Sequence, residues 1–127
     1  MADYLELQIP SATVTATGAS PTQGTGAVNY PSPPKISQGF TSGIFVQEIT
    51  AVNALVSWDE DIQFLLGNQA SWAYLYDTAG NKLSFPQTAV VGLSVLAYQG
   101  VIPANLRTYG TLAGTSVTRQ IDIALGG

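Results

Sequence analysis

The chain has 127 residues, which suits a single domain (residues 1–127) able to bury a hydrophobic core without a metal or disulfide bonds. It contains no cysteine and no histidine. This excludes disulfide frameworks, thiol nucleophiles, zinc sites built on those residues and catalytic triads that need an imidazole base. Charged residues make up only 9% of the chain, and the net charge is −4. The four basic residues are scattered along the chain. Nucleic acids and anionic membrane surfaces are bound by clustered basic residues, so we expect the protein to bind neither of them.

The N-terminal part predicts two strands followed by a long arm. Apolar and polar side chains alternate over residues 4–9, and alanine or valine alternates with threonine over residues 12–17. A period of two is typical of half-buried strands. Residues 18–35 (GASPTQGTGAVNYPSPPK) lose this pattern, and their glycine and proline content predicts an extended loop or arm. We expect an arm of this length to be ordered by a partner or to serve a function.

The middle of the chain predicts further short strands. Residues 44–50 and 52–58 are rich in β-branched and aromatic side chains, which favours strands over a helix. The acidic run 59–61 predicts a solvated turn, and residues 62–66 predict a short strand or a helical turn. A calcium site is the alternative for this acidic run, but consecutive acids on an extended chain point to opposite faces.

Residues 72–85 predict a β-hairpin. An alternating aromatic strand meets a turn that begins at Asp77, and Gly80 and Asn81 can adopt positive φ. A second strand follows and ends before Pro86.

The C-terminal part predicts three more strands. Residues 89–98 are apolar on both faces, as expected for a strand enclosed within the core. Residues 106–112 and 117–124 follow, and in the last segment Arg119 lies on the apolar face. Eight or nine short strands with turn signals at near-regular spacing predict an all-β, antiparallel β-sandwich, of which a jelly roll is one arrangement.

Aromatic side chains are the candidate interaction residues. Trp72, Tyr74 and Tyr76 fall on one face of a strand. An exposed face of this kind would form a stacking platform for sugars or a protein-binding patch, whereas an inward face would be core or subunit interface, the commoner case. Trp58 and Tyr30 are further candidates. The sequence contains no enzyme motif, so we expect no catalytic, cofactor-binding or metal-ligating residues.

The low charge content indicates that part of the surface is covered. A soluble monomer usually covers itself with charged side chains, and this chain has few to place there. Uncharged polar and small side chains are easier to desolvate in an interface. We therefore expect a homo-oligomer or a place in a larger particle, with the arm and the first strand available for exchange between subunits.

The start MADYLEL, the arm SPTQGTGAVNYPSPPK and the strands rich in threonine, glycine and alanine up to Ile123 resemble small cysteine-free β-sandwich proteins of tailed-phage virions. These are capsid decoration (cement) proteins and tail-associated domains. The resemblance implies a non-enzymatic structural protein, located in the virion and in the host cytoplasm during assembly. It implies that the protein binds coat or other virion proteins at junctions between coat subunits and thereby strengthens the shell. Among oligomers, the resemblance favours a trimer. A carbohydrate-binding or adhesion module is the alternative, with a glycan as ligand.

Overall fold

The computed structural model describes residues 4–19, 40–66, 69–103 and 105–127, with the backbone alone at residues 4, 5 and 105. In these ranges the chain forms six strands and no helix. The strands are β1 (Tyr4–Val14), β2 (Gly18–Ala19), β3 (Ser42–Leu65), β4 (Ala73–Tyr74), β5 (Gly92–Gln99) and β6 (Asn105–Gly126).

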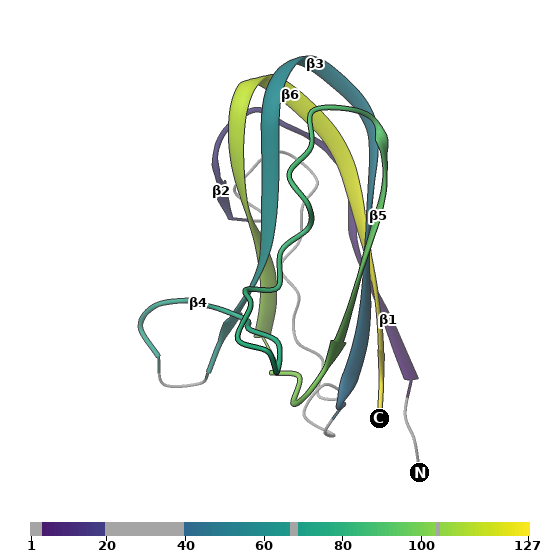
Figure 1. Cartoon of the computed structure of the whole chain (residues 1–127), viewed down its shortest axis with the longest axis vertical. Coiled ribbons are helices and arrows are strands. Elements are labelled where there is room, and N and C mark those ends of the chain that lie inside the picture. The colour runs from purple at the N-terminus through teal and green to yellow at the C-terminus, as the bar shows by residue number, and fades with distance from the viewer. Residues whose placement is uncertain (1–3, 20–39, 67–68, 104) are drawn as a thin grey trace.

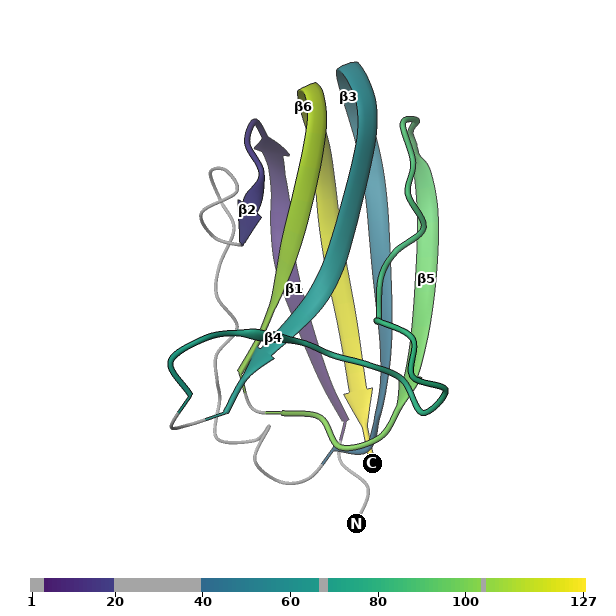
Figure 2. The same ribbon diagram turned by 60° about the vertical axis from the view of Figure 1, so that its left-hand side comes forward.

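The long strands β3 and β6 form the framework of the molecule. They pair antiparallel over nearly their whole lengths, from Ser42 opposite Gly126 to Leu65 opposite Asn105. Both ribbons run to one end of the molecule, turn over and return, so a single sheet folds back on itself (Figures 1 and 2). All strand pairs are antiparallel, and the sheet is not closed.

The turn-over divides the sheet into two halves. The first half contains β1, residues 117–126 of β6, residues 42–49 of β3, and β5, in that order. The second half contains β2, residues 105–113 of β6, residues 57–65 of β3, and β4. Figure 2 shows the two halves of each long ribbon one behind the other.

Irregular backbone allows the long strands to turn over. The β3–β6 register shifts after Ile49 and again after Leu55, and such β-bulges bend a strand and increase its twist. Between the two shifts, Ala54 has a φ of 47°, a left-handed conformation that is rare for a residue with a side chain. On β6, Gly114 pairs with the next residue of β3, Leu55, and has a φ of 116°.

Apolar side chains from both halves meet between them. Period-two alternation points Phe45 and Ile121 inward from the first half, and Ile62 and Leu106 inward from the second. A smaller cluster near the bend joins strands of both halves through a fully buried tryptophan. The larger cluster contains Ile9, Phe40, Phe45, Ile62, Leu75, Leu83, Phe85, Tyr98, Ile102, Leu106, Ile121, Ile123 and Leu125, and the smaller one Val14, Ile49, Trp58 and Val117.

A polar cluster is also sealed between the halves. The Arg119 side chain donates through Nε to both carboxylate oxygens of Glu60, at 3.0 and 2.9 Å, and both side chains have no exposed surface. Gln47 and Trp58 donate to the same carboxylate, at 2.9 and 3.3 Å. Since Glu60 lies in the second half and Arg119 and Gln47 in the first, this cluster ties the halves together.

The predicted all-β, antiparallel fold is confirmed, but the strands are fewer and longer than expected. The segments 44–50 and 52–58 and residues 62–65 of the segment 62–66 are parts of β3, and the segments 106–112 and 117–124 are parts of β6. The local pattern divides both long strands at the bend and divides β3 again at the acidic run 59–61. The described residues therefore form one folded sheet of six strands in place of eight or nine short strands.

The N-terminal segments differ in the same way. The strand expected over residues 4–9 and residues 12–14 of the strand expected over 12–17 form the single strand β1, with a register shift between Ile9 and Ala12. Residues 15–17 follow β1 and are not part of a strand. Of the predicted arm, residues 18–19 form β2, and the rest lies outside the described residues.

The acidic run is not a solvated turn, because it lies within β3. Asp59, Glu60 and Asp61 alternate between the faces of the strand as an extended chain requires. Glu60 faces the buried Arg119, while the Oδ1 atom of Asp61 accepts a hydrogen bond from Ser84 on the other side.

The predicted hairpin at 72–85 is present, with an irregular second strand. Asp77 accepts hydrogen bonds through Oδ1 from the backbone N–H groups of Ala79 and Asn81, both at 2.9 Å, and Gly80 has a φ of 86°. The Leu83 N–H donates to the carbonyl of Leu75 at 2.8 Å and closes the two arms.

Candidate functional site

An apolar strip lies on the outer face of the first half, along β3 and β5. Ile44, Leu93 and Val95 are 50%, 64% and 57% exposed. The register places Val46 beside Val95, and Ile44 beside Ala97. We call these five residues the β5-side strip.

The strip ends at the edge of the sheet. Toward β6 and β1 the same outer face becomes polar, since Asp122 accepts hydrogen bonds from Gln8 at 2.9 Å and Gln120 at 3.0 Å. Toward β5 it stays apolar, and no charged residue occurs between Lys82 and Arg107 in the sequence. The apolar side chains therefore lie beside the backbone of β5, where the sheet ends.

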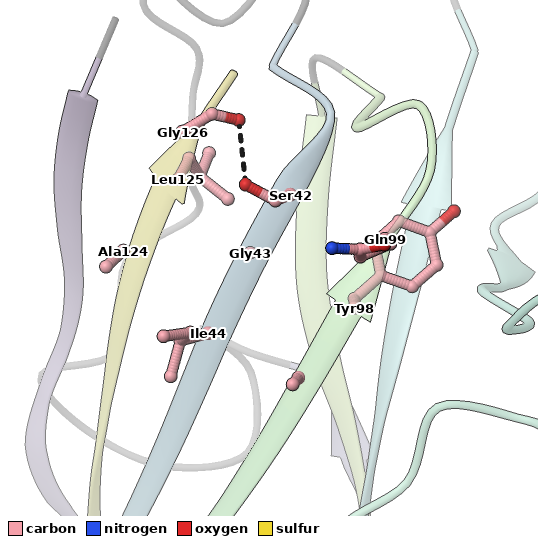
Figure 3. Close-up of a pocket in the computed structure, with 9 residues that line it drawn as sticks. Ser42, Gly43, Ile44, Tyr98, Gln99, Ala124, Leu125 and Gly126 are labelled. Atoms are coloured by element: carbon pink, nitrogen blue, oxygen red, sulfur yellow. Dashed lines mark hydrogen bonds between the residues drawn. The ribbon is translucent and has the colours of Figure 1, made fainter. Parts of the chain in front are cut away.

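A hollow of about 370 Å³ adjoins the strip at the end of the first half. Ile44, Ala97 and Ala124 share one register row across β5, β3 and β6, and all three line the hollow. Figure 3 shows Ile44 and Ala124 on neighbouring strands, and the hydrogen bond of 3.2 Å from the Ser42 hydroxyl to the carbonyl of Gly126. Small side chains create the hollow, so a bulky apolar group from a partner would fit against it.

The aromatic residues of the hairpin form a second surface group, on the outer face of the second half. The Arg107 guanidinium lies 4.2 Å from the centre of the Trp72 ring, and the Lys82 ammonium 4.3 Å from the centre of the Tyr74 ring. These are distances typical of cation–π contacts. Tyr76 is 53% exposed.

Polar neighbours hold both cations in place. The Arg107 Nε donates to Gln63 at 2.7 Å, and the Lys82 ammonium lies 3.4 Å from a carboxylate oxygen of Asp61. Burial lowers the pKa of Arg107 below its ordinary value, and the neighbouring Tyr109 and Tyr74 oppose this shift. Arginine nevertheless remains charged at neutral pH.

The structure brings together three of the five predicted interaction residues. Trp72, Tyr74 and Tyr76 share the outer side of the hairpin region, while Leu75 is buried beneath them. Trp58 has no exposed surface, so its ring is not available as a surface anchor. Tyr30 lies outside the described residues.

The sequence analysis did not identify the β5-side strip. It expected residues 89–98 to be enclosed in the core, but β5 is an edge strand whose outer face is exposed. The signal in the sequence is a run of apolar residues without charges. Such a run is expected for a strand buried in the core and equally for a strand covered by another molecule.

Neither surface resembles a catalytic centre. The buried Glu60 carboxylate is sealed from solvent, so no substrate reaches it. The described residues contain no group of three or more histidine, cysteine or acidic side chains placed to hold a metal ion. In the same part of the chain, no helix is long and apolar enough to cross a membrane.

No family model matches this chain, and no curated protein matches it. Among solved structures, the chain is similar to the SPBc2 prophage-derived protein YomS, with 9% sequence identity and a TM-score of 0.44. This similarity covers 100% of the present chain and 96% of that protein. It concerns the course of the chain alone and carries no information about partners or activity.

Proposed function

We propose that this chain is a non-enzymatic structural protein of a virus particle that binds between coat subunits and stabilises the shell. The β5-side strip is the observation that carries the contact role. The virus particle is inferred from the resemblance of the sequence to decoration proteins of tailed phages. In this role the protein is a homo-oligomer, for which the resemblance favours a trimer, and it is present in the host cytoplasm only during assembly.

Exposed apolar area supports a contact function. Half or more of the surface of Ile44, Leu93 and Val95 is exposed to water. Removing this apolar surface from water is favourable, so a partner that covers it gains binding free energy. The five residues of the strip are uncharged, and the exposed Glu48 beside Leu93 marks the end of the strip. A partner that covers the strip up to this point does not have to desolvate an ion. A folded sheet with a hydrophobic core between its halves is a compact body, which suits a position between coat subunits.

Substitution of Ile44 tests the contact. We expect Ile44→Lys to weaken binding to the shell by about tenfold or more, where tenfold corresponds to about 1.4 kcal/mol. Ile44 has half of its area left to bury, which contributes about 0.8–1.5 kcal/mol, and the introduced ammonium group must in addition be desolvated. The measurement adds purified protein to particles that lack it and follows co-sedimentation and the temperature at which the shell releases its contents.

Val56→Lys is the matched control, since Val56 is 72% exposed but lies at the bend, away from the strip. We expect this variant to bind like the wild type. Wild-type protein that neither co-sediments with the particles nor raises their release temperature would contradict the proposal.

Carbohydrate binding is the second candidate, and the exposed aromatic group favours it. Tyr76 offers an open ring, and Trp72 and Tyr74 lie beside it with a cation over one face of each ring. Sugars stack on rings of this kind.

Trp72→Ala separates the two functions. For a glycan-binding module we expect this variant to lose binding on a glycan array while its urea midpoint changes little, because Trp72 lies outside the buried core. Leu93→Lys is the control that leaves the aromatic group intact. A Trp72→Ala protein that retains all glycan binding, or a wild type that binds none, removes this candidate.

A further inference from the structure

We infer that β5 pairs antiparallel with β5 of a second copy of this chain, centred on Val95, so that the first halves of two molecules join into one continuous sheet. The inference rests on the proposed function, because it adds a second contact beside the β5-side strip: the second copy occupies the backbone edge of β5, and the outer face of the strip stays open to the coat subunits. Such a contact is isologous: the same strand supplies both sides, and the pair closes as a dimer in place of the trimer that the resemblance favours.

The backbone of β5 requires a strand as its partner. In the described part of the chain, β3 is the strand that pairs with β5, which leaves one edge of eight residues with backbone donors and acceptors facing outward. An added strand satisfies these groups and brings its own outer-face side chains beside those of Leu93 and Val95.

The other edges carry the usual protection against pairing. In β1, Pro10 lacks a backbone N–H, the register shift after Ile9 disrupts the ladder, and Glu6 adds a charge. In the second half the edges are the two-residue strands β2 and β4, which are too short to template a partner. β5 has no charge, no proline and no described bulge, so it is the edge left open to another strand.

Charge restricts where a second copy can approach. Each chain has a net charge of −4, so two copies approach most easily through a region with few carboxylates. β5 lies in the uncharged stretch between Lys82 and Arg107. The nearest carboxylate on the outer face is that of Glu48, which pairs with Leu93. In the proposed pair the two Glu48 residues lie three strand spacings apart and four residues apart along the strand, or about 19 Å, where salt screens their repulsion.

The alternation of faces restricts the register. Leu93, Val95 and Ala97 lie on the outer face, while Leu96 and Tyr98 face the core. Directly opposite residues of an antiparallel pair share a face, so outer residues must oppose outer residues.

Two registers meet this condition with an equal overlap of β5, one centred on Val95 and one centred on Leu96. Centring on Leu96 sets Leu93 against the polar Gln99 of the second copy. Centring on Val95 sets Val95 against itself and Leu93 against Ala97, so apolar side chains meet along the outer face, and the pairing takes this register.

Single cysteines test both the pairing and its register, because the wild-type chain has none. We expect Val95→Cys to form a disulfide-linked dimer under mild oxidation, since opposite Cα atoms lie about 4.5–5.5 Å apart, within disulfide range. Leu93→Cys is the matched control. Its equivalent in the second copy is displaced by about 13 Å along the strand, so it should not cross-link to itself. A mixture of Leu93→Cys and Ala97→Cys should form the mixed dimer.

Mass measurement completes the test. Sedimentation of the wild type should give twice the chain mass, and Val95→Lys should give the monomer while Val56→Lys stays dimeric. A wild-type trimer, a wild-type monomer at tens of micromolar, or cross-linking of Leu93→Cys as fast as Val95→Cys would each overturn the β5 pairing. Shell binding is read separately: a monomer that still co-sediments with particles overturns this pairing and leaves the proposed function standing.

Discussion

Replacing Arg119 with methionine is expected to destabilise the protein by about 3–5 kcal/mol, because the change leaves the Glu60 carboxylate buried without its charged partner. Both side chains have no exposed surface, so water cannot solvate the carboxylate in the folded protein. Gln47 and Trp58 still donate to it, but neutral donors compensate for only part of the loss. Small domains have a total stability of about 5–15 kcal/mol, so this loss is a large fraction of the whole.

A second substitution distinguishes an ion-pair effect from a packing effect. We expect Glu60→Gln with Arg119→Met to cost clearly less than the sum of the two single changes, because no isolated charge remains and the introduced amide keeps an acceptor for Gln47 and Trp58. Urea unfolding of the wild type, both single variants and the double variant gives the coupling free energy. Lys82→Met is the surface control: its ion pair with Asp61 is 40% exposed on the lysine side, and we expect a cost of at most about 1 kcal/mol. Additive single and double losses would show that the two side chains are not coupled.

The sequence predicts faces of strands better than it predicts their lengths. The alternation over residues 117–124 correctly placed Arg119 on the apolar face, because period two depends only on the pleat of a single strand. Nothing in the same alternation shows that the strand continues backward through Gly114 to Asn105. A glycine in an extended segment marks a turn between two strands and a bend within one strand equally well.

The acidic run was misjudged for a related reason. Asp59, Glu60 and Asp61 are typical of a solvated turn, and nothing local reveals a partner 59 residues further along the chain. Arg119 pairs with Glu60 only because β3 and β6 both fold over at the same level. Tertiary pairing therefore overrides the local preference. The burial of a charged residue in one segment can be predicted only when the position of its counter-ion in another segment is known.

The surroundings of the candidate site residues could not be predicted from the sequence. The aromatic alternation at Trp72, Tyr74 and Tyr76 places the three rings on one face of a strand, but it gives no information about the cations that lie over two of the rings. The β5-side strip was taken for core because its residues are apolar on both faces. An apolar run in a single sequence indicates side chains that are unfavourable in water. It does not indicate whether residues of the same molecule or of a second molecule lie against them.

Gly114→Ala is expected to destabilise the protein by about 2–5 kcal/mol, because two penalties combine at the bend. The φ of 116° lies in a region that residues with a Cβ atom rarely adopt. A Cβ atom there would also lie 2.8 Å from the Leu55 Cα and from the Val56 nitrogen, and would contact the carbonyl oxygen of Ala54. These are backbone atoms, so no side-chain rotation relieves the contact, and the two long strands must separate where they turn over.

Two controls show whether the bend itself is responsible. Gly92→Ala adds the same methyl group on β5, where nothing lies within 4 Å, and we expect a change of at most about 0.5 kcal/mol. Ala54→Gly removes a side chain from a left-handed conformation that costs about 1–2 kcal/mol, which offsets the added flexibility of the unfolded chain. We therefore expect Ala54→Gly to leave stability unchanged or to raise it slightly. It should not rescue Gly114→Ala, because the carbonyl of residue 54 stays in place. The measurement compares the urea midpoints of Gly114→Ala, Gly92→Ala, Ala54→Gly and the Ala54→Gly/Gly114→Ala double variant with that of the wild type. If Gly114→Ala unfolds at the same midpoint as Gly92→Ala, the close approach of β3 and β6 at the bend does not contribute to the stability of the folded sheet.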